Sequence, residues 1–308
     1  MSQNLTAQTL AIVQAEMQQR QLPAEFQQTV EQWYLPLAQQ VADLHQREQR
    51  CLLISFNGAQ GSGKSTLTAF LQLILPQQFG LNAVTISIDD FYLTRAERQR
   101  LANEVHPLLA TRGVPGTHDV QLASDTLACL RHCSPEHPCR LPLFDKSMDD
   151  RADPTQWAVI DRSVDVILFE GWCNHSPVSS SQELLHPIND LERDEDRDGR
   201  WRHYVNDQLA LYHQRLFDQA DLLVFLKVPS FEKVYEWRGL QEQKLAQSAG
   251  NLQGVMNEQQ LKRFIQHYER ITRQNLLKLP ALADIMLTLN ETHGIDAMYC
   301  KADEAGHV

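Results

Sequence analysis

Three glycines, a lysine and a serine are grouped directly after a short apolar run, in the sequence GAQGSGKS at 58–65. The spacing matches G-x-x-x-x-G-K-[ST], a loop whose backbone N–H groups surround phosphate oxygens while the lysine reaches the outer phosphates. A glycine-rich turn without a ligand is the alternative. The predicted nucleotide-binding residues of this loop are Gly58, Gly61, Ser62, Gly63, Lys64, Ser65 and Thr66.

Acidic residues follow two other apolar runs and would supply the remaining chemistry. SIDDFY places Asp89 and Asp90 at the end of a predicted strand. Phosphoryl transfer to a hydroxyl needs a carboxylate that orients the hydroxyl, so Asp89 is a predicted catalytic residue, as is Lys64. A helix N-cap is the alternative, and it suits Asp90 better. VDVILFE ends in Glu170, which would bind a metal ion together with Ser65, unless it is a surface acid.

The hydrophobic pattern predicts the elements that must position these residues. Helical spacing follows the glycine loop at 65–75 and recurs at 206–219 and 257–277. Short apolar runs typical of buried parallel strands lie at 52–56, 83–88, 164–169, 222–228 and 285–289. This order predicts an α/β fold with a five-stranded, mainly parallel sheet flanked by helices. Ligands of such sheets bind beyond the carboxyl ends of the strands.

The chain is predicted to contain one large domain with additions at both ends. Residues 1–49 are rich in Gln, Leu, Ala and Glu and predict an N-terminal extension of two helices, broken near residue 22. The nucleotide-binding domain would span 50–295, and 296–308 would form a tail. Two internal segments, 103–156 and 176–200, are interpreted as a substrate-side excursion and as a charge-dense, mobile loop with little to bury.

Composition and charge restrict the class of binding partner and the cellular location that we expect for the protein. The formal charge of −11 and the absence of a basic stripe argue against a nucleic-acid partner and favour a small-molecule substrate. No 18-residue apolar run or basic signal region occurs, so we expect no membrane association and a cytoplasmic location. The sequence leaves the oligomeric state open. A zinc site in CLRHCSPEHPC is an alternative, although its cysteine spacing differs from C-x2-C.

Six motifs in this order resemble the D-glycerate 3-kinase family: GAQGSGKST, SIDDFYLT, RGVPGTHD, FDKS, ILFEGW and WRGLQEQKL. That family is similar to the wider uridine kinase, phosphoribulokinase and pantothenate kinase superfamily. The resemblance implies a P-loop NTPase fold, with ATP and Mg²⁺ as cofactors. It also implies a lid at 236–256 in which Arg238 contacts the nucleotide and Lys244 is a weaker substitute.

For the acceptor side, the resemblance implies substrate contacts from Tyr92, Arg112, His118, Asp119, Asp145 and Lys146. Arg112 has an independent argument, because a small hydroxy acid needs a cation and arginine binds a carboxylate through two parallel N–H bonds. Lys146 and Arg151 are alternatives for this contact, and a surface ion pair is the alternative role of Arg112. Phe144 stands where relatives have tyrosine, which removes a hydroxyl and weakens the case for a nucleoside acceptor.

The resulting interpretation is an ATP-dependent kinase that phosphorylates a hydroxyl of a small hydroxy acid, with D-glycerate giving 3-phosphoglycerate as the first choice. Alternatives are a kinase of another small alcohol, such as pantothenate, a nucleoside or a sugar phosphate, and a nucleotide-binding protein without catalysis. A GTP-dependent switch is disfavoured because the guanine-reading tetrapeptide N-K-x-D does not occur.

Overall fold

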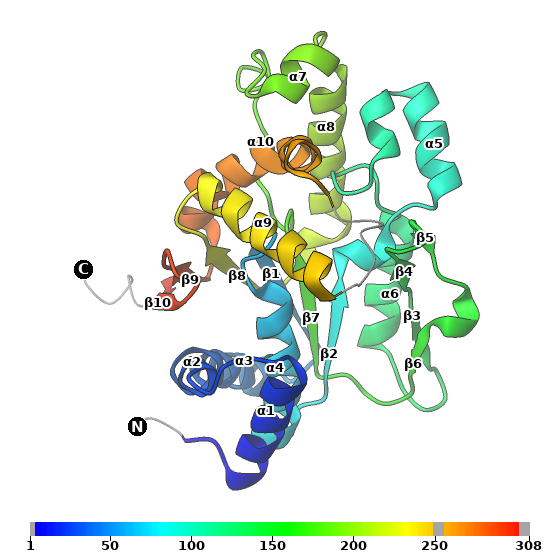
Figure 1. Cartoon of the computed structure of the whole chain (residues 1–308). Coiled ribbons are helices and arrows are strands. Elements are labelled where there is room, and N and C mark those ends of the chain that lie inside the picture. The colour runs from blue at the N-terminus through cyan, green and yellow to red at the C-terminus, as the bar shows by residue number, and fades with distance from the viewer. Residues whose placement is uncertain (1–3, 249–255, 302–308) are drawn as a thin grey trace, which may run out of the picture.

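A six-stranded sheet forms the centre of the molecule, in the order β10-β9-β8-β1-β7-β2 (Figure 1). The computed structural model describes residues 4–248 and 256–301, without the side chains of 241–248. The strands are β1 (Leu52–Gly58), β2 (Ala83–Ser87), β7 (Val166–Gly171), β8 (Leu222–Lys227), β9 (Ile285–Leu289) and β10 (Ile295–Cys300). All of these strands except β10 run parallel to one another. This confirms the predicted α/β class and its five parallel strands.

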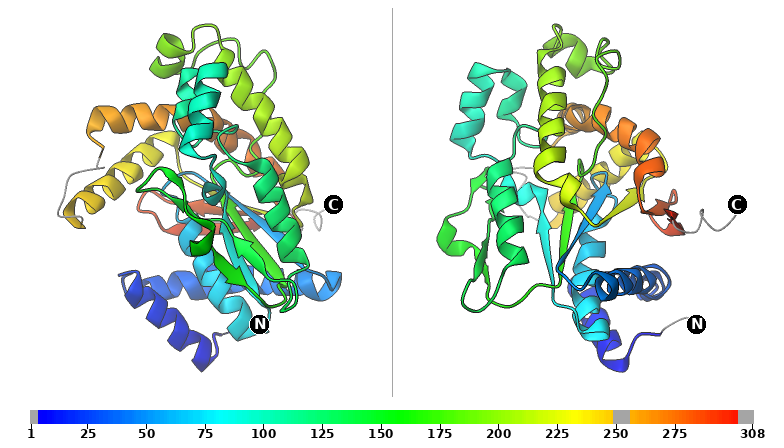
Figure 2. Two further views of the ribbon diagram at one scale, coloured as in Figure 1. Left: turned by 90° about the vertical axis from the view of Figure 1, so that its right-hand side faces the viewer. Right: turned by 180° about the vertical axis from the view of Figure 1, so that it is seen from behind.

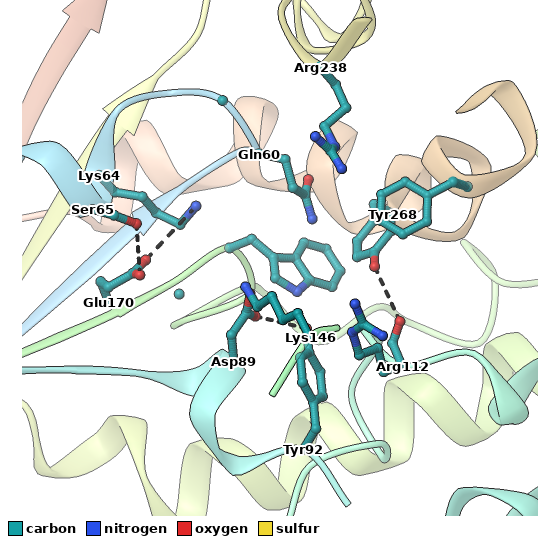
Figure 3. Close-up of a pocket in the computed structure, with 14 residues that line it drawn as sticks. Gln60, Lys64, Ser65, Asp89, Tyr92, Arg112, Lys146, Glu170, Arg238 and Tyr268 are labelled. Atoms are coloured by element: carbon teal, nitrogen blue, oxygen red, sulfur yellow. Dashed lines mark hydrogen bonds and ion pairs between the residues drawn. The ribbon is translucent and has the colours of Figure 1, made fainter. Parts of the chain in front are cut away.

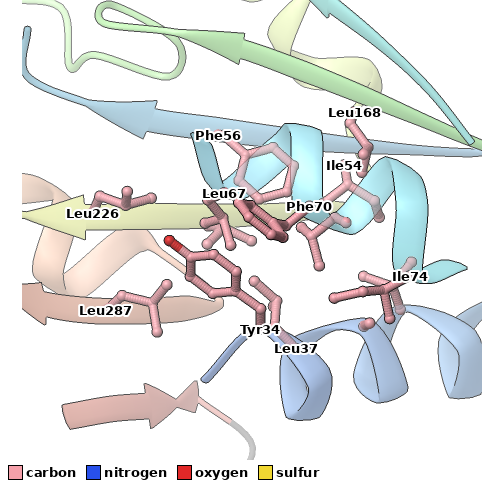
Figure 4. Packing of buried hydrophobic residues seen from close by; sticks show 14 of the residues in the cluster. Tyr34, Leu37, Ile54, Phe56, Leu67, Phe70, Ile74, Leu168, Leu226 and Leu287 are labelled. Atoms are coloured by element: carbon pink, nitrogen blue, oxygen red, sulfur yellow. The ribbon is translucent and has the colours of Figure 1, made fainter. Parts of the chain in front are cut away.

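Both faces of the central strands β1, β7 and β8 are buried, which explains why these strands are mainly apolar runs. Successive residues of β1 point to opposite faces, so Ile54 and Phe56 join one core cluster and Leu53 joins the other. The first cluster is closed by α4 (Lys64–Phe79) and the N-terminal helices (Figure 4). The second is closed by α6 (Val120–Arg131) and α8 (Arg200–Arg215) on the opposite face (Figure 2).

The N-terminal extension forms two helical segments, as predicted. The first is α1 (Ala7–Gln19), and the second runs from α2 (Phe26–Thr29) through a π-helical turn at Val30–Tyr34 into α3 (Leu35–Glu48). The rings of Phe26 and Tyr34 lie 5.5 and 5.9 Å from that of Phe70 on α4. The extension therefore shares its core with the sheet.

The predicted tail at 296–308 contains the sixth strand, so that part of the prediction was wrong. β10 pairs antiparallel with β9 across a tight turn, in which Oδ1 of Asn290 accepts from the backbone N–H groups of Thr292 and Gly294. The strand lies at the sheet edge and its residues are largely half-buried, so its sequence lacks a continuous apolar run. Residues 302–308 lie outside the described part of the chain.

The excursion at 103–156 is more regular than its sequence indicates. It contains a 3₁₀ turn (Pro107–Ala110) and α6. Two small sheets follow, one from β3 (Cys139–Leu141) and β6 (Ala158–Ile160), the other from β4 (Phe144–Asp145) and β5 (Asp150–Arg151). Among the described residues, His106, Asp196 and Asp198 are the one group of His, Cys, Asp or Glu side chains close enough to share a metal ion. None of the cysteines proposed for a zinc site belongs to this group.

The prediction that 176–200 has little to bury was wrong. The segment contains α7 (Asp190–Glu195), and the carboxylates of Glu192 and Asp196 are 1% and 0% exposed. Asp196 pairs with Arg202 at 2.8 Å, and Glu192 pairs with Arg270 on α10 (Glu258–Leu282) at 2.5 Å. Buried ion pairs thus fix a stretch whose charge density suggested a solvated loop.

In the described part of the chain, none of the helices combines the length and apolar character that a membrane crossing requires.

Candidate active site

A cavity of about 350 Å³ lies beyond the carboxyl ends of the strands (Figure 3). The register places Glu170 of β7 beside Phe56 of β1 and Ser87 of β2, so the loops that follow these strands meet at one edge. The cavity is lined by Gln60, Gly61, Lys64, Ser65, Asp89, Tyr92, Arg112, Lys146, Glu170, Gly171, Trp172, Arg238, Phe264 and Tyr268. Eight of the predicted catalytic, metal and ligand positions are therefore brought together with Arg238.

The glycine loop connects β1 to α4, and its backbone requires glycine at several positions. Gly61 and Gly63 have φ angles of +80° and +89°, in the left-handed region that side chains disfavour. A Cβ atom on Gly58 would lie 2.5 Å from Oγ of Ser62. The loop ends at the first residue of α4, so free N–H groups and the positive end of the helix dipole face the cavity.

Lys64, Ser65 and Glu170 form a compact group at the start of α4. Oγ of Ser65 donates to Oε1 of Glu170 at 2.9 Å, and Nζ of Lys64 lies 4.0 Å from Oε2. The Glu170 carboxylate and the Ser65 hydroxyl are hard oxygen donors of the kind that Mg²⁺ prefers. The residues present fit a magnesium ion bound next to the phosphate loop.

The remaining loop positions have different surroundings. Gly58, Ser62, Gly63 and Thr66 are not among the residues that line the cavity, and Ser62 is 2% exposed. Gly58 and Gly63 have no side chain, and Ser62 and Thr66 do not line the cavity, so any phosphate contact from these four positions comes from the backbone. Their assignment to the nucleotide stays a prediction.

Asp89 lies in a 3₁₀ turn (Ile88–Phe91) directly after β2. Its Oδ1 accepts from the hydroxyl of Tyr92 and its Oδ2 from Nζ of Lys146, both at 2.8 Å. Burial acts to raise the pKa of Asp89, but the Lys146 ammonium and the two hydrogen bonds outweigh it and hold the pKa below its usual value. Asp89 is therefore an ionised hydrogen-bond acceptor at neutral pH.

Asp90 has the opposite electrostatic environment. Burial, and then the neighbouring charge of Asp89, raises the pKa of Asp90 to about 6. The alternative that it caps a helix was wrong, because Ser87 caps the 3₁₀ turn by accepting from the Asp89 backbone N–H. The two adjacent aspartates thus differ in ionisation and in surroundings.

Arg112 is presented by a loop that four side chains hold in place. Nε1 of Trp172 donates to the carbonyl of Gly113 at 3.0 Å, and the hydroxyl of Tyr268 donates to the carbonyl of Arg112 at 3.3 Å. Oγ1 of Thr117 accepts from Gly113 N at 3.0 Å. A Cβ on Gly113 would lie 2.0 Å from the Tyr268 hydroxyl, so the loop packs this closely only because of the glycine. The guanidinium of Arg112 reaches the cavity (Figure 3).

Tyr212 of α8 is the fourth of these side chains, and it contacts His118. Its hydroxyl accepts from Gly116 N at 2.7 Å and lies 2.9 Å from Nδ1 of His118. The His118 ring stacks on Tyr92 with centroids 4.5 Å apart. Burial lowers the pKa of His118 to about 4, so the ring is neutral. His118 packs against the Tyr92 ring and does not line the cavity.

Two further predicted substrate residues have structural roles. Asp119 caps α6 by accepting from Leu122 N at 3.0 Å and pairs with Arg151 at 3.1 Å. Asp145 closes a turn by accepting from the backbone N–H and hydroxyl of Ser147. Neither residue lines the cavity, because each carboxylate is engaged in these structural contacts.

Five cavity residues were missed: Gln60, Gly171, Trp172, Phe264 and Tyr268. Gln60 and Trp172 lie within motifs already singled out, next to Gly61 and after Glu170, so their positions carried a signal. Phe264 and Tyr268 lie one turn apart on α10, where sequence spacing indicates only a buried face. Arg238 of α9 (Phe231–Ser248) stacks over Phe264 at 5.7 Å, which places the predicted lid cation at the cavity. The side chain of Lys244 lies outside the described residues.

Comparison with known proteins identifies the family. No family model matches the chain. The uncharacterized kinase mug58 of Schizosaccharomyces pombe is 33% identical over 235 residues, covering 72% of this chain and 79% of the relative. The chloroplastic D-glycerate 3-kinase of Arabidopsis thaliana is 32% identical over 227 residues, covering 70% of this chain and 46% of the relative.

A solved structure agrees with these sequence relatives. The D-glycerate 3-kinase from Cryptococcus neoformans matches with a TM-score of 0.73 at 26% identity, over 90% of this chain and 99% of that protein. The chain belongs to the D-glycerate 3-kinase family and is an ATP-dependent kinase.

Proposed function

We propose that this kinase transfers the γ-phosphoryl group of ATP to a hydroxyl of a small hydroxy acid, most specifically D-glycerate to give 3-phosphoglycerate. One observation carries the proposal: the cations Arg112 and Lys146 line the same cavity as the phosphate loop and Asp89. If these cations bind the acceptor's carboxylate, its hydroxyl would lie near Asp89 and would face the phosphate loop. The cytoplasmic location stays a prediction from the sequence.

The nucleotide side supplies positive charge and a metal site. Lys64 and Arg238 line the cavity and would offset charge on the β and γ phosphates. Ser65 and Glu170 would hold Mg²⁺, and the ion would offset negative charge on the phosphates. The backbone N–H groups at the start of α4 complete the phosphate site.

Asp89 would orient the acceptor hydroxyl more than it removes the proton. Its lowered pKa makes it a weak base, and each carboxylate oxygen that bonds Tyr92 or Lys146 retains a lone pair for the hydroxyl. A loose transition state requires little proton removal early in the transfer. The hydroxyl proton would pass to Asp89 late, as the new P–O bond forms.

The charge balance on the acceptor side favours a monocarboxylate over a phosphate ester. Arg112 already pairs with Asp149, and Lys146 pairs with Asp89. Each cation therefore has a carboxylate neighbour, which leaves little surplus charge for a phosphate dianion. Phe144 packs its ring against Tyr92 at 5.2 Å and presents no hydroxyl to a nucleoside sugar.

The test is ADP release over a panel of acceptors, followed by NMR identification of the phosphorylated position. D-Glycerate, L-glycerate, pantothenate, uridine and fructose 6-phosphate would be compared at matched concentrations, with glycerol as the matched control that lacks the carboxylate. We expect D-glycerate to have the highest kcat/KM and glycerol to be poor. Equal turnover of glycerol, or faster turnover of uridine or the sugar phosphate, would contradict the proposal.

A further inference from the structure

The loop between β4 and β5 contacts two groups of the acceptor side at once. It carries Lys146, which lies 2.8 Å from Oδ2 of Asp89, and Asp149, whose Oδ1 pairs with the guanidinium of Arg112. One short hairpin thus connects the carboxylate that would orient the hydroxyl with the arginine that would bind the acceptor's carboxylate. Lys146 was predicted as a substrate residue, whereas Asp149 has no assigned role.

A second arginine fixes Asp149. The side chain of Arg98 is 1% exposed, and its NH2 group lies 3.0 Å from Oδ2 of Asp149 and donates to the Asp149 carbonyl at 2.7 Å. Its other donors bond the carbonyls of Leu93 at 3.2 Å and Ala110 at 2.9 Å. Asp149 has a φ of +53°, a left-handed conformation that aspartate adopts more readily than most residues. Groups outside the cavity therefore set the orientation of this carboxylate.

We propose that Asp149 is a positioning residue that orients the Arg112 guanidinium toward the acceptor's carboxylate, an inference that rests on the proposed function. Asp149 holds one side of the guanidinium, and Phe144 lies against its face with the ring centroid 5.5 Å away. The Arg112 side chain remains 30% exposed and lines the cavity (Figure 3). An arginine fork binds a carboxylate through two parallel bonds only in a fixed plane, so prior orientation lowers the entropy cost of binding.

Asp149 is a permanent partner of Arg112, and the acceptor does not displace it. A carboxylate held only by Arg112 could exchange with the acceptor's carboxylate. Here Arg98 binds both the Asp149 carboxylate and its backbone carbonyl, and displacement would leave a buried guanidinium without its anion. Loss of the Asp149 charge should therefore weaken acceptor binding, whereas loss of a competing carboxylate would strengthen it.

The experiment is a double-mutant cycle between Asp149→Asn and Arg112→Ala in the full-length kinase, with D-glycerate as the acceptor. KM for D-glycerate, KM for ATP, kcat and melting temperature would be measured for each variant. Asp153→Asn is the matched control, since Asp153 lies in the same segment and bonds only Thr155 in a neighbouring turn. Asp149→Glu is the second variant, because it keeps a charge for Arg98 but moves the carboxylate.

We expect Asp149→Asn to raise KM for D-glycerate on the order of tenfold, with KM for ATP and kcat near wild type. The effect should largely vanish in the Arg112→Ala background, and Asp153→Asn should behave as wild type. If Asp149→Asn does not fold, Asp149→Glu should show the same selective rise.

Three outcomes would overturn the inference. The first is an unchanged or lower KM for D-glycerate in both Asp149 variants. The second is a rise that adds fully to that of Arg112→Ala, which would leave the proposed function standing. The third is an unchanged KM in Arg112→Ala alone, which would also remove Arg112 from the proposed function.

Discussion

Lys146 and Asp89 are separated by 57 residues in the chain, and their side chains form an ion pair of 2.8 Å in the cavity. The pair joins the hairpin of the excursion to the turn after β2. It opposes the effect of burial on Asp89, so the carboxylate stays ionised beside the phosphate loop. The ionisation of Asp89 is therefore controlled by a residue of a different segment.

Lys146→Met should raise the pKa of Asp89, because burial then acts without the ammonium that opposes it. Ionised Asp89 is the acceptor of the hydroxyl hydrogen bond, so the acid limb of the kcat profile should move to higher pH. Lys146→Arg keeps the charge and is the control, with an acid limb close to that of wild type. An acid limb that does not move in Lys146→Met would show that another group controls it.

Lys64→Ala should lower kcat by roughly 10²–10³, the usual cost of removing one preorganised donor from a transition-state charge. The melting temperature should change little, since Lys64 makes only a 3.4 Å bond to the carbonyl of Ala59 and a 4.0 Å pair with Glu170. Lys262→Ala removes an exposed lysine from α10 and serves as the control. Wild-type turnover in Lys64→Ala with a cooperative fold would show that the loop is not the catalytic phosphate site.

Asp89→Asn keeps the size of the side chain and removes the ionised oxygen, so turnover should fall by roughly 10²–10⁴ with little change in ATP affinity. A fall near the lower limit would agree with a mainly orienting role. Asp90→Asn should retain more activity, because Asp90 does not line the cavity. If Asp90→Asn abolishes transfer while Asp89→Asn does not, the catalytic assignment belongs to Asp90.

Asp90→Asn should stabilise the ligand-free protein at neutral pH. The pKa of Asp90 is raised to about 6, so between pH 4 and 6 the folded state binds more protons than the unfolded state. This group therefore lowers the free energy of unfolding as pH rises through that window. Relative to wild type, the variant should gain up to about 3 kcal/mol, because each pKa unit is worth about 1.4 kcal/mol. The measurement is urea unfolding at pH 4, 5, 6 and 7, and a constant difference between the two proteins would refute the assignment.

The sheet and the phosphate loop could be predicted because their signals are local. A strand buried on both faces must be mainly apolar, and β1, β7 and β8 are buried at consecutive positions. β2 and β9 are partly exposed, but their sequences are still short apolar runs. β10 was missed because an edge strand needs no such run. The order of the 176–200 segment was missed because its buried carboxylates depend on Arg202 and Arg270, the latter on a helix that begins more than 50 residues later.

The residues of the acceptor side could also be predicted from the sequence only in part. RGVPGTHD and FDKS pointed to residues that include Arg112 and Lys146, which line the cavity, but also to Asp119 and Asp145, which cap a helix and close a turn. A motif places all its polar residues in one short segment, and only packing decides which of them face a ligand. Tyr268 could not be connected with Arg112, because their contact joins residues 156 positions apart.

The sequence by itself determined the α/β class, the phosphate loop and the strand ends that carry Asp89 and Glu170, because glycine conformation and hydrophobic periodicity act over a few residues. Only the tertiary structure decided that Lys146 lowers the pKa of Asp89 and keeps its carboxylate ionised. It also decided that Tyr268 and Trp172 hold the Arg112 loop, and that Asp149 lies between two arginines. These contacts join segments brought together by helix and loop packing, and their geometry follows from the whole folded core.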